Sequence, residues 1–330
     1  MKKILAEGLV KKLEEIHTKD ELKTIEAGFK TEKRKPTFRI NTLKANKDKT
    51  IENLLENGLK ISKISYLKNG FTLDEGTEKD LWNTGAFKAG YIYMQGISSM
   101  IPPLLFDFDE DSSKTKLLDV TAAPGSKTSQ LSMLMNNKGQ IIACDNNEIR
   151  VDKLKFTIKR QGCTNVGVVK KNAVNLAKEL KHQFEAAPEE YFDKILFDAP
   201  CSAEGRMNLN IEKTYAYWKE AIPKRNYKLQ KDIISNAITM LKPGGELVYS
   251  TCTLSPEENE GLVHFVLSMF PEIELVDISA NKILKKLETK KGLKFYGKNP
   301  YRKDIINTVR ILPTSEYEGF YVAKFIKKAV

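Results

Sequence analysis

Residues 116–137 read KLLDVTAAPGSKTSQLSMLMNN. The first five residues have the character of a buried strand, TAAPGSKT forms a loop of small residues, and the remainder is typical of a helix. The same alternation recurs along the chain, with further strands predicted at 140–145, 165–172, 194–200 and 246–251, and two last strands at 273–278 and 319–326. Five strand–helix alternations predict an α/β fold with a doubly wound sheet.

The first 100 residues follow a different pattern. Residues 1–30 read as one helix, 37–43 as a strand, 48–59 as a helix and 60–67 as a weaker strand. Strand, helix and strand in so short a segment predict a small α+β module. We therefore expect two domains, an N-terminal α+β module at 1–100 and a larger domain at 101–330.

The composition is that of an ordinary soluble globular protein, with 41% hydrophobic and 29% charged residues among 330. Neither a signal peptide nor an apolar run of about 20 residues is present, so we expect a cytoplasmic protein without a membrane partner. The four cysteines match no zinc pattern, so we predict free thiols and no metal. A net charge of +11 favours nucleic acid as a partner, although a lysine-rich surface explains it equally simply.

The loop DVTAAPGSKT (119–128) has the features of a cofactor site. Gly125 permits a tight turn, and amides at the start of a helix favour a carboxylate or phosphate. A single glycine excludes both the dinucleotide fingerprint and the Walker loop. Asp145 ends the second strand, where an acidic side chain typically receives ribose hydroxyls. This combination predicts S-adenosyl-L-methionine; the alternative is a plain turn with Asp145 as a helix cap.

Two stretches, FDAPCSAEG (197–205) and YSTCTLSPEENE (249–260), each place a cysteine just past a buried strand. Because parallel strands react at their carboxyl ends, Cys201 and Cys252 should converge. A thiolate that adds to carbon-6 of a pyrimidine makes carbon-5 nucleophilic toward an electrophilic methyl group, and an acid near nitrogen-3, such as Asp198, would help. A nearby cation such as Lys127 would lower the thiol pKa.

Other interpretations of these stretches remain open. A redox-active cysteine pair lacks the C-x-x-C spacing. The other two cysteines, Cys144 and Cys163, read as buried hydrophobic residues. The sequence Ser255-Pro256-Glu257-Glu258 predicts a helix start with a capping box.

These motifs resemble those of the Nol/Nop/Sun (Sun-type) family of RNA cytosine-5 methyltransferases, and FRINTLK (38–44), YMQGISSM (93–100) and EGFYVAKF (318–325) extend the match over about residues 38–326. The resemblance implies a class I (Rossmann-like) S-adenosylmethionine-dependent methyltransferase sheet. It implies that Cys252 is the nucleophile on carbon-6, that Cys201 assists release of the RNA adduct, that Asp198 contacts the base and the cofactor, and that Lys127 lines the site. The implied cofactor residues are Thr121, Ala122, Ala123, Pro124, Gly125, Ser126, Lys127, Asp145, Arg150, Asn172 and Asp198.

Four residues depart from the usual family pattern. Thr121 stands where a cysteine is common and Ser126 where a second glycine is common, and both are small enough to be tolerated. Asn172 replaces an aspartate that meets the adenine amino group, and its side-chain oxygen can still accept that hydrogen bond. Gly96 replaces a frequent aspartate.

The resemblance also implies an RNA-binding N-terminal module, with a basic face formed by Lys30, Lys33, Arg34, Lys35 and Arg39. The segment 285–303 adds cations interleaved with aromatic residues, a composition that suits RNA or, equally, a solvated loop. The compact form favours tRNA as substrate, with rRNA as the alternative, and we expect a monomer. Rival hypotheses are a catalytically inactive RNA-binding or assembly factor and a methyltransferase that acts on an amino nitrogen.

Overall fold

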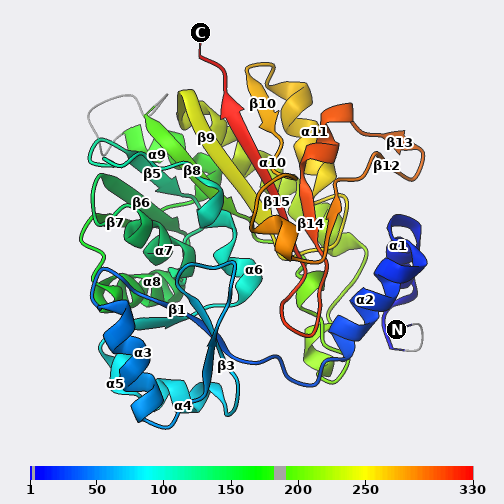
Figure 1. Cartoon of the computed structure of the whole chain (residues 1–330). Helices are drawn as coiled ribbons and strands as arrows, with labels where there is room; N and C mark the ends of the chain where they lie inside the picture. Colours follow the sequence, from blue (N-terminus) through cyan, green and yellow to red (C-terminus); the bar gives the residue numbers. More distant parts are fainter. Residues whose placement is uncertain (2–3, 182–190, 330) are drawn as a thin grey trace. The chain divides into compact units, whose positions relative to one another are not determined.

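The computed structural model describes residues 1, 4–181 and 191–329 (Figure 1). Its contacts divide the chain into two compact units. The split unit consists of Met1–Arg34 with Val174–Val330, and the inserted unit is Lys35–Ala173. The first 34 residues therefore share a core with the C-terminal half of the chain. The predicted division into an N-terminal module at 1–100 and a larger domain at 101–330 stays a prediction.

The inserted unit begins with a small antiparallel sheet in the order β2-β3-β1-β4. Its core is formed by apolar side chains from the strands and from helix α3, among them Phe38 and Ile40 of β1, Phe71 of β3 and Leu54 of α3. The elements are β1 (Thr37–Ile40), α3 (Lys47–Glu56), β2 (Ile61–Lys63), β3 (Gly70–Leu73), α4 (Glu78–Asn83), α5 (Gly85–Lys88), β4 (Ile92–Met94) and α6 (Ile97–Met100). The predicted α+β pattern is present.

The same unit continues with three parallel strands, in which β6 pairs with both β5 and β7. The connecting helix α8 ends at Gly162, whose φ of 69° is the left-handed conformation that a C-terminal glycine adopts readily. Here the predicted strands agree with the observed ones to within two residues. The elements are β5 (Lys116–Asp119), α7 (Ser126–Leu134), β6 (Gln140–Asp145), α8 (Glu148–Gln161) and β7 (Val166–Lys170).

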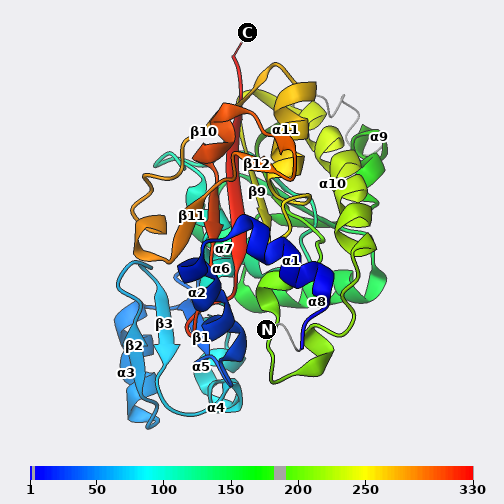
Figure 2. The same ribbon diagram turned by 90° about the vertical axis from the view of Figure 1, so that its right-hand side faces the viewer.

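The split unit is built on the parallel pair β8 and β9, and β15 runs antiparallel to β9. β14 and β10 pair with the two halves of β15, and β11 pairs with β14. Helices α10 and α11 pack side by side, and α9 contacts α10 (Figure 2). The elements are α9 (Leu176–Lys181), β8 (Phe192–Asp198), α10 (Ala221–Met240), β9 (Leu241–Thr251), α11 (Glu260–Met269), β10 (Ile273–Val276), β11 (Thr289–Lys291), β12 (Phe295–Tyr296), β13 (Asn299–Pro300), β14 (Val309–Ile311) and β15 (Phe320–Lys327).

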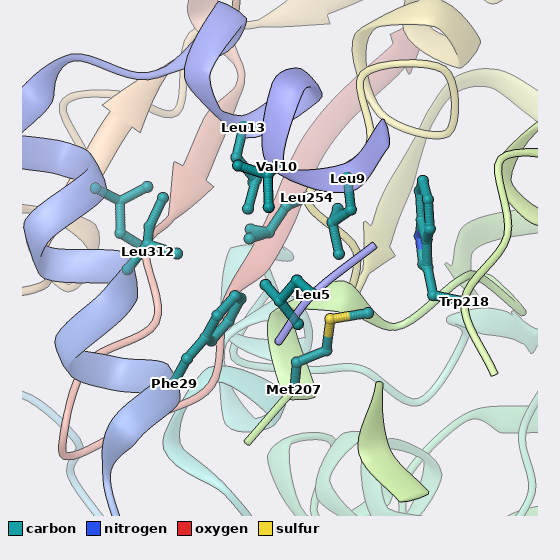
Figure 3. Packing of buried hydrophobic residues seen from close by; sticks show 10 residues of the cluster. Leu5, Leu9, Val10, Leu13, Phe29, Met207, Trp218, Leu254 and Leu312 are labelled. Carbon is teal, nitrogen blue, oxygen red and sulfur yellow. The ribbon is translucent and has the colours of Figure 1, made fainter. Parts of the chain in front are cut away.

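Two helices, α1 (Glu7–Ile16) and α2 (Lys19–Lys30), replace the single helix predicted for residues 1–30. The break lies at Thr18, which forms a capping box with Glu21 and so starts a new helix. Figure 3 shows that Leu5, Leu9 and Leu13 point toward side chains from distant parts of the split unit. This cluster also contains Val10, Ile25, Phe29, Met207, Trp218, Leu254 and Leu312.

Among the described residues, none of the helices is long and apolar enough to cross a membrane. Within the same part of the chain, no three His, Cys, Asp or Glu side chains gather in a way that could hold a metal ion.

Candidate active site

Two thiols meet at the carboxyl ends of β8 and β9. The strands are in parallel register with Asp198 opposite Ser250, so the chain leaves both strands at the same edge. The Sγ atoms of Cys201 and Cys252 lie 3.4 Å apart, and both residues are half-buried free thiols. A site with two sulfurs in contact can combine a nucleophile with a proton donor.

The thiol of Cys201 holds its proton tightly. The hydrogen bond with the Cys252 sulfur, followed by burial and the negative charges of Cys252 and Glu258, raises the pKa of the Cys201 thiol well above its usual value. Cys201 therefore keeps its proton and can donate it to the sulfur of Cys252.

Asp198 stands at the end of β8, on the strand that leads to Cys201. Its Oδ1 accepts a hydrogen bond from the hydroxyl of Ser250 at 2.7 Å, and Ser250 is completely buried. The main-chain N–H of Ala199 also donates to the Ser250 carbonyl at 2.8 Å. These bonds fix the carboxylate of Asp198. It lies three residues before Cys201 and opposite Ser250, which comes two residues before Cys252.

Two buried glutamates join the site; the sequence analysis assigned Glu258 only to a helix cap and gave Glu204 no role. Glu204 and Glu258 lie within the two quoted stretches, and both are fully buried. The predicted helix start at Ser255 is wrong, because α11 begins at Glu260 and Glu258 bonds with Ser202 and Gln230 instead of capping a helix. Burial and the nearby Glu204 carboxylate raise the pKa of Glu258 to about 8.

The loop 121–127 lies in the inserted unit, where it connects β5 to α7. Gly125 has a φ of 102° and caps α7, and an added Cβ would lie 2.9 Å from Leu154 Cδ1, so the tight turn needs glycine. The N–H of Ala122 donates to the Cys144 carbonyl at 2.8 Å, which ties the loop to β6. Lys127 is buried, and its Nζ donates to Ser99 Oγ at 3.1 Å.

Asp145 and Arg150 approach this loop from β6 and α8. Arg150 donates to the Ala123 carbonyl at 2.7 Å and lies 3.2 Å from the Asp145 carboxylate, which is only 4% exposed. The cap of α8 is Asn147, so the interpretation of Asp145 as a helix cap is wrong. A carboxylate, main-chain amides at a helix start and small side chains fit a nucleoside carrying an amino-acid group, which is the chemistry of S-adenosylmethionine.

Two of the residues that depart from the family pattern, Asn172 and Gly96, can be placed in the structure. Asn172 is exposed and follows β7. Gly96 has no atom within 4 Å of where a Cβ would lie, so the fold does not demand glycine there.

The prediction that Arg39 forms part of a basic RNA-binding face is wrong. Its side chain is 1% exposed and donates to Gln95 at 2.9 Å and to Ser129 Oγ at 2.7 Å. A third bond reaches the Ser126 carbonyl at 3.3 Å. Arg39 therefore supports the 121–127 loop from within the inserted unit and is not available to RNA.

The fold is that of the Rossmann-like methyltransferases. A solved structure of a methyltransferase homolog protein from Pyrococcus horikoshii superposes with a TM-score of 0.80 at 30% identity, over 98% of this chain and 95% of that one. The chain belongs to the 16S rRNA methyltransferase RsmB/F family, whose profile matches residues 108–326. This membership confirms the resemblance stated from the motifs.

Two curated relatives represent two RNA classes. The chain is 36% identical over 248 residues to the ribosomal RNA small subunit methyltransferase F of Shewanella woodyi, and covers 48% of it. It is 35% identical over 296 residues to the tRNA (cytosine(49)-C(5))-methyltransferase of Pyrococcus abyssi, with 89% of this chain and 88% of that protein covered. The chain thus spans about half the length of the rRNA relative and most of the tRNA relative.

Proposed function

We propose that the protein is an S-adenosylmethionine-dependent RNA (cytosine-5) methyltransferase. The observation that carries this proposal is the 3.4 Å separation of the Cys201 and Cys252 sulfurs at the ends of two neighbouring parallel strands. A nucleophile by itself needs only one thiol. A reaction that forms and then breaks an adduct on a ring carbon needs a nucleophile and a second group that accepts a proton beside it.

The reaction begins at Cys252. Its thiolate bonds to carbon-6 of the cytosine, and the electron pair of the 5,6 double bond moves toward carbon-5, which takes up the methyl group. When bound, S-adenosylmethionine supplies an electrophilic methyl group. Loop 121–127, Asp145, Arg150 and Asn172 would hold it, and Asp198 would orient the base near nitrogen-3.

Release depends on Cys201. Cys201 gives up its thiol proton to solvent, and its sulfur then acts as the base that removes the proton of carbon-5. The double bond forms again and the Cys252 sulfur leaves as a thiolate.

The proposed substrate is tRNA, and the protein acts as a cytoplasmic monomer. The nearly full-length match to a tRNA enzyme supports tRNA, while the family profile and the rRNA relatives support rRNA as the alternative. A net charge of +11 supports a polyanionic partner. Phe295, which is 62% exposed on the β12–β13 segment among lysines, offers a surface on which an unpaired base can stack.

The test combines labelled product analysis with adduct trapping. Labelled S-adenosylmethionine is incubated with separate tRNA and rRNA, and the RNA is digested to nucleosides; we expect label in 5-methylcytosine from tRNA. Cys201→Ala should accumulate an RNA-linked protein on a denaturing gel, and Cys252→Ala should not. Label on an amino nitrogen, or full activity of Cys252→Ala, would overturn the proposal. Label in rRNA alone would select the alternative.

A further inference from the structure

Hydrogen bonds from two buried glutamates connect the two loops that carry the thiols. The first thiol loop (199–205) follows β8, and the second thiol loop (252–258) follows β9. Glu204 of the first loop reaches into the second, where it accepts hydrogen bonds from Ser255 Oγ at 2.6 Å, from Leu254 N at 3.1 Å and from the hydroxyl of Thr253. Trp218 Nε1 donates a fourth bond at 2.8 Å.

Glu258 makes the reverse connection from the second loop to the first. It accepts from the main-chain N–H of Ser202 at 3.1 Å and also contacts the Ser202 hydroxyl. Gln230 Nε2 of α10 donates to the same carboxyl at 3.0 Å. The linked positions are the residues that directly follow each thiol, since Ser202 follows Cys201 and Thr253 follows Cys252.

The hydroxyls between the two carboxyls complete a chain. Ser202 Oγ lies 2.8 Å from Thr253 Oγ1, so contacts run from Glu258 to Ser202, to Thr253 and to Glu204. Three consecutive hydrogen bonds need three hydrogens, and the two hydroxyls supply only two. The third hydrogen must be a proton on one carboxyl group.

Geometry decides which carboxyl group carries it. Each oxygen of Glu204 accepts a bond from an N–H group, Oε1 from Trp218 and Oε2 from Leu254. In Glu258 the shortest N–H bonds, from Ser202 and Gln230, both reach Oε1, whereas Oε2 faces the hydroxyl of Ser202. Glu204 therefore acts as the acceptor at one end. Glu258 is the donor at the other end, and its pKa, which burial and then Glu204 raise to about 8, agrees with a retained proton at neutral pH.

We propose that Glu204 and Glu258, which share one proton through Ser202 and Thr253, are positioning residues that hold the two sulfurs in register for release of the RNA adduct. This inference rests on the proposed function. Buried carboxyl groups seldom add net stability over apolar packing, so a role in the geometry of the thiols explains them better than stability alone. Cys201 must reach carbon-5 while Cys252 is bonded to carbon-6, and a misplacement of about 1 Å is expected to slow such a step about 100-fold.

The decisive variant is Glu204→Gln. Its amide NH2 would face donors only, so one end of the chain breaks while the side-chain volume is kept. We expect multiple-turnover kcat to fall about 100-fold, the single-turnover rate of methyl transfer and the KM for tRNA to stay within about threefold, and a covalent RNA adduct to accumulate. By contrast, Glu258→Gln supplies an NH2 donor where the protonated carboxyl donates, and should release RNA at nearly the normal rate, whereas Glu258→Ala should not.

A matched control is Glu246→Gln, which makes the same change at a buried glutamate paired with Lys194 and Lys324 toward the opposite end of β9. It should show no adduct. If Glu204→Gln does not fold, Ser202→Ala carries the test, because it removes the middle of the chain and keeps the main-chain N–H.

The outcomes separate the two proposals. Parallel loss of single-turnover and multiple-turnover rates in folded Glu204→Gln or Ser202→Ala, or equal behaviour of Glu258→Gln and Glu258→Ala, would overturn the positioning role. Absence of an adduct in Cys201→Ala, together with an inactive parent protein, would instead overturn the proposed methyltransferase reaction.

Discussion

The four cysteines fall into two pairs with opposite surroundings. In the split unit, Cys201 and Cys252 are half-buried at strand ends, with their sulfurs in contact and a buried polar network behind them. In the inserted unit, Cys144 and Cys163 are buried, and Cys163 packs among apolar side chains of the core. Burial raises the pKa of Cys163 without giving it a neighbouring sulfur.

This difference shows that position within the sheet decides what a cysteine does. A cysteine inside a strand, such as Cys144 in β6, presents its sulfur to the packed layers of the fold. A cysteine one to three residues past the last strand residue is placed where the backbone no longer pairs and a substrate can approach. The same side chain is therefore a core residue in one unit and a candidate nucleophile in the other.

The largest difference should appear in catalysis. Cys252→Ala removes the proposed nucleophile, and we expect the rate of methyl transfer to RNA to fall at least about 1,000-fold. Cys163→Ala, the matched change in the inserted unit, should leave kcat within about twofold and lower the unfolding free energy by roughly 1 kcal/mol. Initial rates and urea unfolding of both variants check this, and an active Cys252→Ala enzyme would end the distinction.

Chemical labelling should give the next largest difference. Iodoacetamide on the native protein should alkylate Cys252 first and at least about 100-fold faster than Cys144 or Cys163, because exposure and thiolate content govern the rate. Cys201 should follow only as the pH rises, since it holds its proton more tightly. Mass spectrometry of peptides at several pH values measures the order, and prior reaction of Cys201 at neutral pH would contradict it.

The sequence predicts most of the frame of both units. Strand 140–145 and the tight turn at Gly125 follow from an apolar run and one glycine, because these signals are local. The contact between the two sulfurs follows from the rule that parallel strands end at one edge, although the two cysteines are 51 residues apart.

Long-range partners explain the errors. Arg39 reads as a surface residue because its partners Gln95 and Ser129 lie 56 and 90 residues away. Glu258 matches a local capping rule, yet Ser202, 56 residues before it, captures its carboxyl group. The break at Thr18 is different, because its capping box is visible in the sequence.

The smallest expected effect concerns stability and pH. The pKa of Glu258 is about 8 in the folded protein, against 4.5 as its ordinary value, because of burial and then the charge of the nearby Glu204. Its contribution to stability is complete below pH 4.5 and is lost as the pH rises toward 8. The unfolding free energy of Glu258→Gln should therefore fall less between pH 5 and pH 8 than that of the parent, by roughly 2 kcal/mol.

Urea unfolding at several pH values measures this change, with Cys163→Ala as the variant from the inserted unit that keeps the parental pH dependence. Identical slopes in Glu258→Gln and the parent would show that Glu258 is ionised throughout.

The shared core of the N-terminal helices and the second thiol loop has a consequence for biosynthesis. Leu5, Leu9 and Leu13 leave the ribosome long before their partners Leu254 and Leu312 are translated. The intervening segment Lys35–Ala173 can fold by itself during this interval, while the apolar faces of the two N-terminal helices stay exposed to solvent. Nascent chains of this protein should therefore bind chaperones early. The two thiol loops should reach their final arrangement only after the last strand has been synthesised.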